Sequence, residues 1–296
     1  MASVYTHQSS NTAKTYLLMG LFLVIIAGLG YFISVYYNDP SLFFIAIIFS
    51  LFMNVASFWF SDKIVLSISK AKPASRQEFF DLYTVTENLS IAAGLPMPKI
   101  YVIDDPAPNA FATGRDKKHA VVAVTTGLLQ KLERTELEGV IAHELSHIGN
   151  RDILLMSAVV VLVGFVSIIS DIFLRGMVFG RGGNRDNNRA GGVLAIVGIV
   201  LIILSPIIAT LIKLAISRRR EYLADASGAL LTRYPEGLAK ALEKISAYNI
   251  PMKVASIATA HLFISDPLKK KSSISNLFQT HPPIEERIKI LRGMIS

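Results

Sequence analysis

Consecutive residues in the middle of the chain have the types and spacing of a zinc-binding helix: His143-Glu144-Leu145-Ser146-His147. Two histidines four residues apart lie on one face of a helix, where both imidazoles can bind the same ion. The glutamate between them can accept a proton from an activated water molecule and pass it to a leaving amine. The pattern therefore indicates the chemistry of a metallopeptidase.

The sequence around this motif predicts the helix that must carry it, from about Thr135 to Arg151. The letters T-E-L-E that begin at Thr135 have the pattern of a capping box, which marks helix starts. Helix-compatible apolar residues follow at 140–142. Both histidines would then lie well inside one helix, as a shared metal ion requires.

A catalytic zinc site needs a third protein ligand, because three ligands leave the fourth position for water. Glu221 and Asp225 are candidates, since they lie four residues apart in a helical pattern. One carboxylate can bind the ion while the other accepts the free N–H of a ligand histidine. The residue types alone equally allow a solvated helix face that pairs with Arg218 to Arg220.

The composition is too apolar for a soluble protein of 296 residues, with 52% hydrophobic residues and a mean hydropathy of +0.47. The excess lies in four blocks: Tyr16 to Tyr37, Ser41 to Phe60, Ile153 to Leu174 and Gly192 to Ile216. The first two have no charged residue and reach the roughly 20 residues needed to cross a bilayer. The other two contain one charged residue each. We expect about four transmembrane helices, of which the first is a retained anchor rather than a signal peptide.

The charges suggest which side of the membrane carries the polar parts. Basic stretches such as Arg218 to Arg220 and Lys269 to Lys271 place those parts in the cytoplasm. The loop from Gly176 to Ala190 contains three arginines and one aspartate, which conflicts with a position outside the cytoplasm. Either this loop is a tolerated exception, or the third and fourth blocks do not fully span the membrane.

The overall charge and the absence of cysteine exclude some classes of partner and site. A net charge of +8 is compatible with nucleic-acid binding, but no recognition motif accompanies it. Attraction to anionic lipid explains this charge better. Because the chain has no cysteine, disulfides and thiolate zinc sites are excluded.

The blocks divide the chain into four regions. We expect a transmembrane hairpin at 1–62, a cytoplasmic protease part with the H-E-x-x-H helix at 63–152, a second transmembrane pair at 153–216, and a second cytoplasmic protease part at 217–296.

The first cytoplasmic part shows local structure patterns. A helix is expected from Ala74 to Ala93, and short strands are expected at Lys99 to Ile103 and His119 to Thr125. Between these strands, Asn109 to Thr113 is either an exposed edge that can pair with an extended peptide or an ordinary surface loop.

Several segments resemble the HtpX family of bacterial membrane zinc proteases over nearly the whole chain. The related CAAX prenyl proteases share the H-E-x-x-H and E-x-x-x-D elements. Besides the H-E-x-x-H residues, the segments that carry the resemblance are Asn150-Arg151-Asp152, Arg219 to Asp225, and Asn109-Ala110-Phe111-Ala112. This resemblance implies a mainly α membrane protein with an α+β, gluzincin-like zinc metalloprotease domain.

The resemblance also implies roles for single residues. His143 and His147 would bind one Zn²⁺ per chain with Glu221 as the third ligand, Glu144 would be the general base, and Asp225 would support a ligand. His281, before Pro282, resembles a histidine thought to stabilise the oxyanion, a role that an N–H donor can serve. Asn109, Ala110, Phe111 and Ala112 match the segment that binds the substrate backbone.

The expected function is therefore that of a membrane-integrated zinc endopeptidase of the bacterial inner membrane. Its polypeptide substrates would be misfolded or damaged membrane proteins, and its site would face the cytoplasm. If the helix runs unbroken from His147 to Ile153, only about 9 Å of axis separates the two, which places the metal within roughly 10 Å of the membrane surface.

Two other functions compete with this one. An intramembrane protease fits less well, because charged residues flank the motif too closely for bilayer depth. A non-catalytic zinc scaffold or sensor would use the same ligands, but it would need no base at Glu144.

Overall fold

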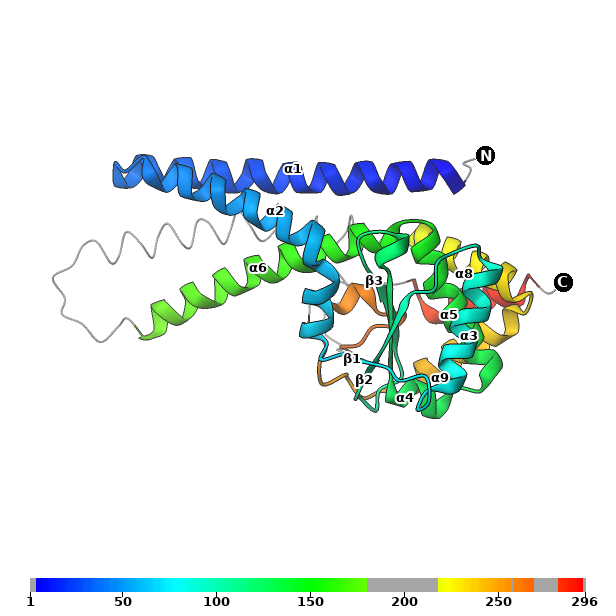
Figure 1. Cartoon of the computed structure of the whole chain (residues 1–296). Coiled ribbons are helices and arrows are strands. Elements are labelled where there is room, and N and C mark those ends of the chain that lie inside the picture. The colour runs from blue at the N-terminus through cyan, green and yellow to red at the C-terminus, as the bar shows by residue number, and fades with distance from the viewer. Residues whose placement is uncertain (1–3, 180–217, 257, 269–281, 295–296) are drawn as a thin grey trace.

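The computed structural model describes residues 4–179, 218–256, 258–268 and 282–294. Its first elements are two long helices, α1 (Val4–Tyr37) and α2 (Ser41–Ile68), which form a hairpin that projects from a globular part (Figure 1). The turn between them passes through Asn38, whose φ of 51° lies in the left-handed region that asparagine tolerates. The predicted N-terminal hairpin is therefore present, and α2 continues past residue 62.

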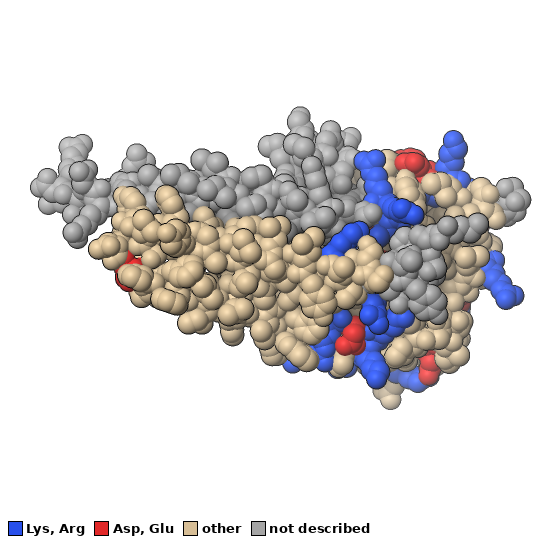
Figure 2. Space-filling view, turned by 90° about the horizontal axis from the view of Figure 1, so that it is seen from above, with Lys and Arg blue, Asp and Glu red and all other residues tan. Residues whose placement is uncertain are grey.

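The hairpin has the surface of a membrane anchor. Ser9–Tyr37 and Ser41–Ile68 are each long and apolar enough to cross a bilayer. Large apolar side chains face outward along both helices; Leu17 is 68% exposed and Phe52 is 66% exposed. On the face that Figure 2 shows, Lys and Arg gather over the globular part, away from the projecting end of the hairpin. Two spans are thus found among the described residues.

The third apolar block forms the helix α6 (Asp152–Phe179), but it does not continue α5 (Arg134–Gly149) in a straight line. The two helices meet at a bend of 85°, and together they count as a third span only if the bent pair crosses as one. Arg151 at the bend has a φ of 59°. The expected unbroken helix through His147 is therefore wrong, and the fourth block, from Gly192 to Ile216, lies outside the described residues.

A small sheet lies beside α5. Its strand order is β1-β2-β4-β3, in which β2 and β4 are parallel while β1 and β3 pair antiparallel with their neighbours. The sheet brings the segment of β3 to its outer edge, next to α5 and α6. The strands are β1 (Lys72–Pro73), β2 (Lys99–Ile103), β3 (Ala110–Thr113) and β4 (Val121–Thr125).

Helices surround this sheet and α5. The remaining helices are α3 (Phe80–Ala92), α4 (Thr126–Lys131), α8 (Arg218–Thr232), α9 (Pro235–Ala247) and α10 (Ile284–Arg292), with short 3-10 turns at Lys117–His119 and Ala260–Leu262. The chain is thus mainly α with a small α+β globular part, as expected for the fold class.

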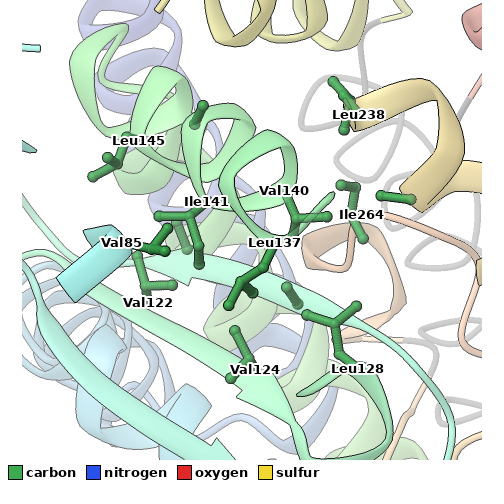
Figure 3. Close-up of a cluster of buried hydrophobic side chains, with 14 of the residues drawn as sticks. Val85, Val122, Val124, Leu128, Leu137, Val140, Ile141, Leu145, Leu238 and Ile264 are labelled. Carbon is green, nitrogen blue, oxygen red and sulfur yellow. The ribbon is translucent and has the colours of Figure 1, made fainter. Parts of the chain in front are cut away.

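The core forms between α5 and the sheet. Leu137 and Ile141 on α5 lie in one buried cluster with Val122 and Val124 of β4 (Figure 3). Because α5 is also covered by α8 and α9, eleven of its residues are buried. The helix that carries the H-E-x-x-H motif is therefore a central element of the globular part.

Two local predictions need correction. The start of α5 is capped by Glu133, whose backbone N–H donates to Glu136 Oε2 at 2.8 Å, and not by a box at Thr135. The helix α3 begins at Phe80 rather than at Ala74, because Ala74 N donates to Ile100 O and so extends the pairing of β1 with β2. A backbone held in the extended conformation of a strand cannot also adopt helical dihedral angles.

Candidate metal centre

His143 and His147 point to one side of α5, as their spacing predicts. Both are buried, with 0% and 5% of their surface exposed, and their Nε2 atoms lie 3.2 Å apart. Burying two imidazoles this close together without a shared partner is unfavourable, because polar atoms lose their hydration. The geometry is that of two ligands that face one ion.

Glu221 reaches the same point from α8. Its carboxylate oxygens lie 3.6 Å from His147 Nε2 and 3.9 Å from His143 Nε2. Ligands about 2.1 Å from a tetrahedral zinc ion are roughly 3.4 Å from one another. One ligand atom from each of the three residues lies within 4.8 Å of the others, so this donor set fits a zinc ion.

A close approach of the two helices makes this cluster possible. Gly228 of α8 packs against α5, and a Cβ atom on it would lie only 3.0 Å from the backbone nitrogen of His143. The absence of a side chain therefore lets α8 lie directly on the helix that carries the histidines. Glu221 lies about two helical turns before Gly228 on α8, and Asp225 lies less than one turn before it. Both carboxylates are thereby held at the metal centre.

Each histidine has a carboxylate on its other ring nitrogen. His147 Nδ1 is hydrogen-bonded to Asp152 Oδ2 at 2.9 Å. His143 Nδ1 also lies 2.9 Å from Asp225 Oδ1, although this contact is less well aligned for a hydrogen bond. A carboxylate at Nδ1 holds the proton there and leaves Nε2 free for a metal, so both rings have the tautomer that a ligand needs.

Arg287 of α10 completes the environment of Asp225. Its guanidinium is fully buried and donates to Asp225 Oδ2 at 2.8 Å and Oδ1 at 2.7 Å, and to Ile264 O at 2.9 Å. Burial alone would raise the pKa of Asp225, but the charge and hydrogen bonds of Arg287 outweigh it and lower this pKa to about 2. Asp225 is therefore held as a carboxylate against His143.

Asp152 has its own partner, from a distant part of the chain. Asn11 near the start of α1 donates from Nδ2 to Asp152 Oδ1 at 2.6 Å and to Asn150 O at 3.2 Å. Asn11 is 4% exposed and Asp152 is 0% exposed. The hairpin and the metal centre are thus in direct contact.

Glu144 lies between the histidines on the same helix and is 1% exposed. Among the described residues neither of its carboxylate oxygens has a hydrogen-bond partner. Burial raises the pKa of this carboxyl to about 7, against the opposing charges of His147 and Arg287. The backbone N–H of Ala112 is the one protein donor that acts on Glu144 among the described residues, and it is poorly aligned. A buried carboxylate with so little protein hydrogen bonding is suited to a group that comes from outside, such as water or substrate.

Two further predicted parts of the site remain: the first lies at a partly covered sheet edge, and the second lies outside the described residues. Asn109 to Ala112 are all buried, and the β3 edge is partly covered because Ala110 O accepts from Ile264 N at 2.9 Å. The segment is thus at a sheet edge but is not the exposed edge that a free peptide-binding strand would offer. His281 lies outside the described residues.

Sequence reasoning assigned no role to Asn11, Asp152 or Arg287. Arg287 did leave a signal, since it lies between Ile284 and Leu291 at positions of α10 that face the core. An arginine at such a position is seldom buried without a carboxylate partner. Asp152 belongs to the Asn150-Arg151-Asp152 segment that carries the family resemblance, but no sequence pattern assigned it a role, and Asn11 left no local signal.

Known proteins match this chain along its whole length. A model of peptidase family M48 matches residues 76–295. Relatives named Protease HtpX homolog, from Caldanaerobacter subterraneus subsp. tengcongensis and Thermoanaerobacter pseudethanolicus, are 50% and 48% identical. Each alignment covers 99% of this chain and 98% of the relative.

A solved structure has a similar fold. The crystal structure of S. mikatae Ste24p matches with a TM-score of 0.52 at 19% identity, over 97% of this chain and 66% of that longer chain. The family predicted from the H-E-x-x-H and E-x-x-x-D segments is confirmed: the chain belongs to peptidase family M48 and is an HtpX-type metalloprotease.

Proposed function

We propose that this membrane metalloprotease is a zinc endopeptidase of the bacterial inner membrane that removes misfolded or damaged membrane proteins. The observation that carries the proposal is the buried cluster of His143, His147 and Glu221 at the base of an apolar hairpin. Two imidazoles and one carboxylate are a typical ligand set of catalytic zinc. One ion per chain would be bound there.

The residues around the cluster have separate roles in the proposed reaction. A bound zinc ion supplies Lewis acidity, which polarises a peptide carbonyl and acidifies a water molecule. Glu144 accepts the proton of the attacking water and transfers it to the leaving amine, a task for which a pKa raised by burial is suitable. Asp225 and Asp152 hold the rings of His143 and His147 in the ligand orientation.

The substrate side of the site remains a prediction with partial support. The β3 edge next to α5 would bind the substrate backbone once the Ile264 segment moves aside, because Ala110 O is engaged by that segment. His281 would stabilise the oxyanion. Neither role is tested by the positions of the described residues.

The position of the site favours membrane proteins as substrates. Asn11 contacts the metal centre through Asp152, and the charge-free stretch of α1 begins at Thr15, about 6 Å further along the helix axis. The zinc would therefore lie close to the membrane surface, where damaged membrane proteins expose their segments. The contact through Asn11 thus supports a site near the membrane without an unbroken helix from His147 to Ile153.

Two observations argue against the rival functions of an intramembrane protease and a non-catalytic zinc scaffold. Glu133 and Arg134 at the start of α5 are exposed, and Arg134 pairs with Asp81 at 3.1 Å, which is a water-facing arrangement rather than a bilayer interior. A zinc scaffold would not need a buried glutamate without partners between its ligands. Both observations favour a protease outside the hydrocarbon core.

The decisive experiment separates the base from the ligands. Glu144→Gln should abolish hydrolysis of denatured casein by the purified protein and leave its zinc content at one per chain, because the amide keeps the shape but accepts no proton. His143→Ala and Glu221→Ala should instead lose zinc, and a chelator should inhibit the unaltered protein. Full activity in Glu144→Gln would refute the proposed mechanism.

The cytoplasmic orientation has a test of its own. The chain has no cysteine, so Ser41→Cys at the hairpin turn and Ser75→Cys in the globular part are matched single labels at exposed positions. An impermeant maleimide should reach residue 41 in spheroplasts and residue 75 only after lysis. The reverse pattern would place the site outside the cytoplasm.

A further inference from the structure

We propose that Asn11, on the first membrane helix, is a positioning residue of the metal centre that acts through Asp152 on His147. The inference rests on the proposed role of His147 as a zinc ligand and extends it to a residue outside the globular part. It implies that metal affinity depends on how α1 is seated against that part.

One side-chain amide, that of Asn11, holds two acceptors next to His147, and we call this contact the clamp. The amide nitrogen of Asn11 lies 2.6 Å from Asp152 Oδ1 and 3.2 Å from Asn150 O. Both neighbours are acceptors only, so the nitrogen and not the oxygen of the amide must face them. Because the three residues are buried, no water competes for these two hydrogen bonds.

The clamp holds the bend between α5 and α6. Asn150 is the C-terminal cap of α5, and Asp152 is the first residue of α6. Between them Arg151 has a φ of 59°, in the left-handed region that is unfavourable for a residue with a side chain. Asn11 bonds one group on each side of this bend and so stabilises a backbone that is locally unfavourable.

The bend in turn fixes His147. Asp152 Oδ2 accepts from His147 Nδ1 while Asp152 Oδ1 accepts from Asn11, so both carboxylate oxygens have defined partners. Among the described residues, Arg220 has its Nε atom 4.0 Å from Asp152 Oδ1. Without Asn11 the carboxylate can turn toward Arg220, and the ring of His147 then loses its fixed orientation.

The expected effect is moderate. Changing a residue that directly holds a ligand histidine lowers metal affinity by about 10- to 100-fold. Asn11 does not hold the histidine directly but acts through its hydrogen bond to Asp152. Asn11→Ala should therefore weaken zinc binding by about three- to tenfold. The loss should appear in metal affinity whether or not substrate is present.

The chain offers a matched control in Asn54. This second asparagine of the hairpin also donates from Nδ2 to a backbone carbonyl of the neighbouring helix, Met19 O at 3.2 Å, but it lies away from the metal centre. Asn54→Ala removes the same type of helix contact. If the effect of Asn11→Ala were general loosening of the hairpin, Asn54→Ala would reproduce it.

The experiment measures zinc dissociation constants of the full-length protein in detergent micelles by competition with a chromogenic chelator. Four variants are compared with the unaltered protein: Asn11→Ala, Asp152→Ala, the double variant and Asn54→Ala. We expect Asn11→Ala to weaken binding in the unaltered background and to have no further effect beside Asp152→Ala, because its action passes through that residue. The Co²⁺ absorption bands should shift in Asn11→Ala and stay unchanged in Asn54→Ala.

Equal losses in Asn11→Ala and Asn54→Ala, or additive losses in the double variant, would overturn the proposal. His147→Ala separates it from the proposed function. If His147→Ala keeps full zinc affinity, the metal site itself is wrong. If His147→Ala loses zinc while Asn11→Ala binds it normally, only the positioning role fails.

Discussion

The two histidines of the metal centre are supported in similar ways by very different parts of the molecule. His143 is backed by Asp225 and then by the buried guanidinium of Arg287. His147 is backed by Asp152 and then by the neutral amide of Asn11. The His143 half of the site, with Asp225 and Arg287, is an ion pair inside the globular part. The His147 half, with Asp152 and Asn11, ends on a membrane helix.

This difference separates two tasks. A bidentate, buried arginine fixes a carboxylate strongly, and removing it leaves an uncompensated charge. An amide supplies a hydrogen bond but no counter-charge to its carboxylate, and losing it costs less than breaking a buried ion pair. The half at His143 is thus built for rigidity, while the half at His147 connects the site to the anchor at a lower energetic cost.

The largest effect should follow from breaking the charged half. Arg287→Met leaves Asp225 buried without its counter-charge and should lower the free energy of unfolding by about 3 to 5 kcal/mol. Asn11→Ala should lower it by about 1 to 3 kcal/mol. Denaturant unfolding in detergent, followed by circular dichroism, compares the two. Equal losses would mean that the two halves do not differ as described.

An intermediate effect should follow from replacing either carboxylate. Asp225→Asn and Asp152→Asn should each weaken zinc binding by about 10- to 100-fold, since each amide can no longer hold its histidine as a charged acceptor does. Asp225→Asn should also lower stability more than Asp152→Asn does, because it removes the bidentate partner of Arg287, which then keeps only the Glu221 carboxylate at 3.6 Å. Zinc competition and thermal unfolding on the same samples test both parts; a stability loss confined to Asp152→Asn would contradict the comparison.

The smallest effect should come from the helix contact behind the His143 half. Gly228→Ala places a Cβ atom 3.0 Å from the His143 backbone, so α8 must shift by a few tenths of an ångström. Overpacking costs about 1 to 3 kcal/mol and the alanine recovers up to about 1 kcal/mol of helix propensity, which leaves a small net loss of stability.

The matched control for this change lies on α6. A Cβ atom on Gly164 would meet Ala258 Cβ at 4.0 Å, an ordinary contact. Gly164→Ala should therefore leave stability unchanged or raise it slightly. If both glycine variants unfold at the same temperature as the unaltered protein, the close approach of α5 and α8 is not what positions Glu221.

The parts of the site that sequence predicts are those encoded locally. The helix of His143 and His147 follows from their spacing and the flanking pattern. The same periodicity puts Glu221 and Asp225 on one helix face, but only the family resemblance favours a ligand role over a solvated face. The two outer partners are not predictable in this way, because Asn11 reaches Asp152 across 141 positions and Arg287 reaches Asp225 across 62. Such contacts depend on the bend at Arg151 and on the packing of α10, which no local pattern specifies.

The fold shows the same limit. The apolar hairpin was predictable from its uncharged length, whereas the start of α3 depends on the pairing of Ala74 with Ile100 in a neighbouring strand. The cap of α5 was placed at Thr135 because threonine is a preferred cap, yet Glu133 has that position and Lys244 of α9 binds Glu136 beside it. Tertiary contacts thus decided the helix ends.

Groups from early and late in the polypeptide meet at the metal, and this has a consequence during biosynthesis. At about 5 to 20 residues per second, roughly 7 to 28 seconds separate the synthesis of His147 from that of Arg287. Asp225 is made within that interval, and it has no counter-charge while the 62 residues up to Arg287 are added. A ribosome-bound chain with its hairpin already inserted therefore cannot complete the surroundings of His143 until α10 docks and Arg287 pairs with Asp225.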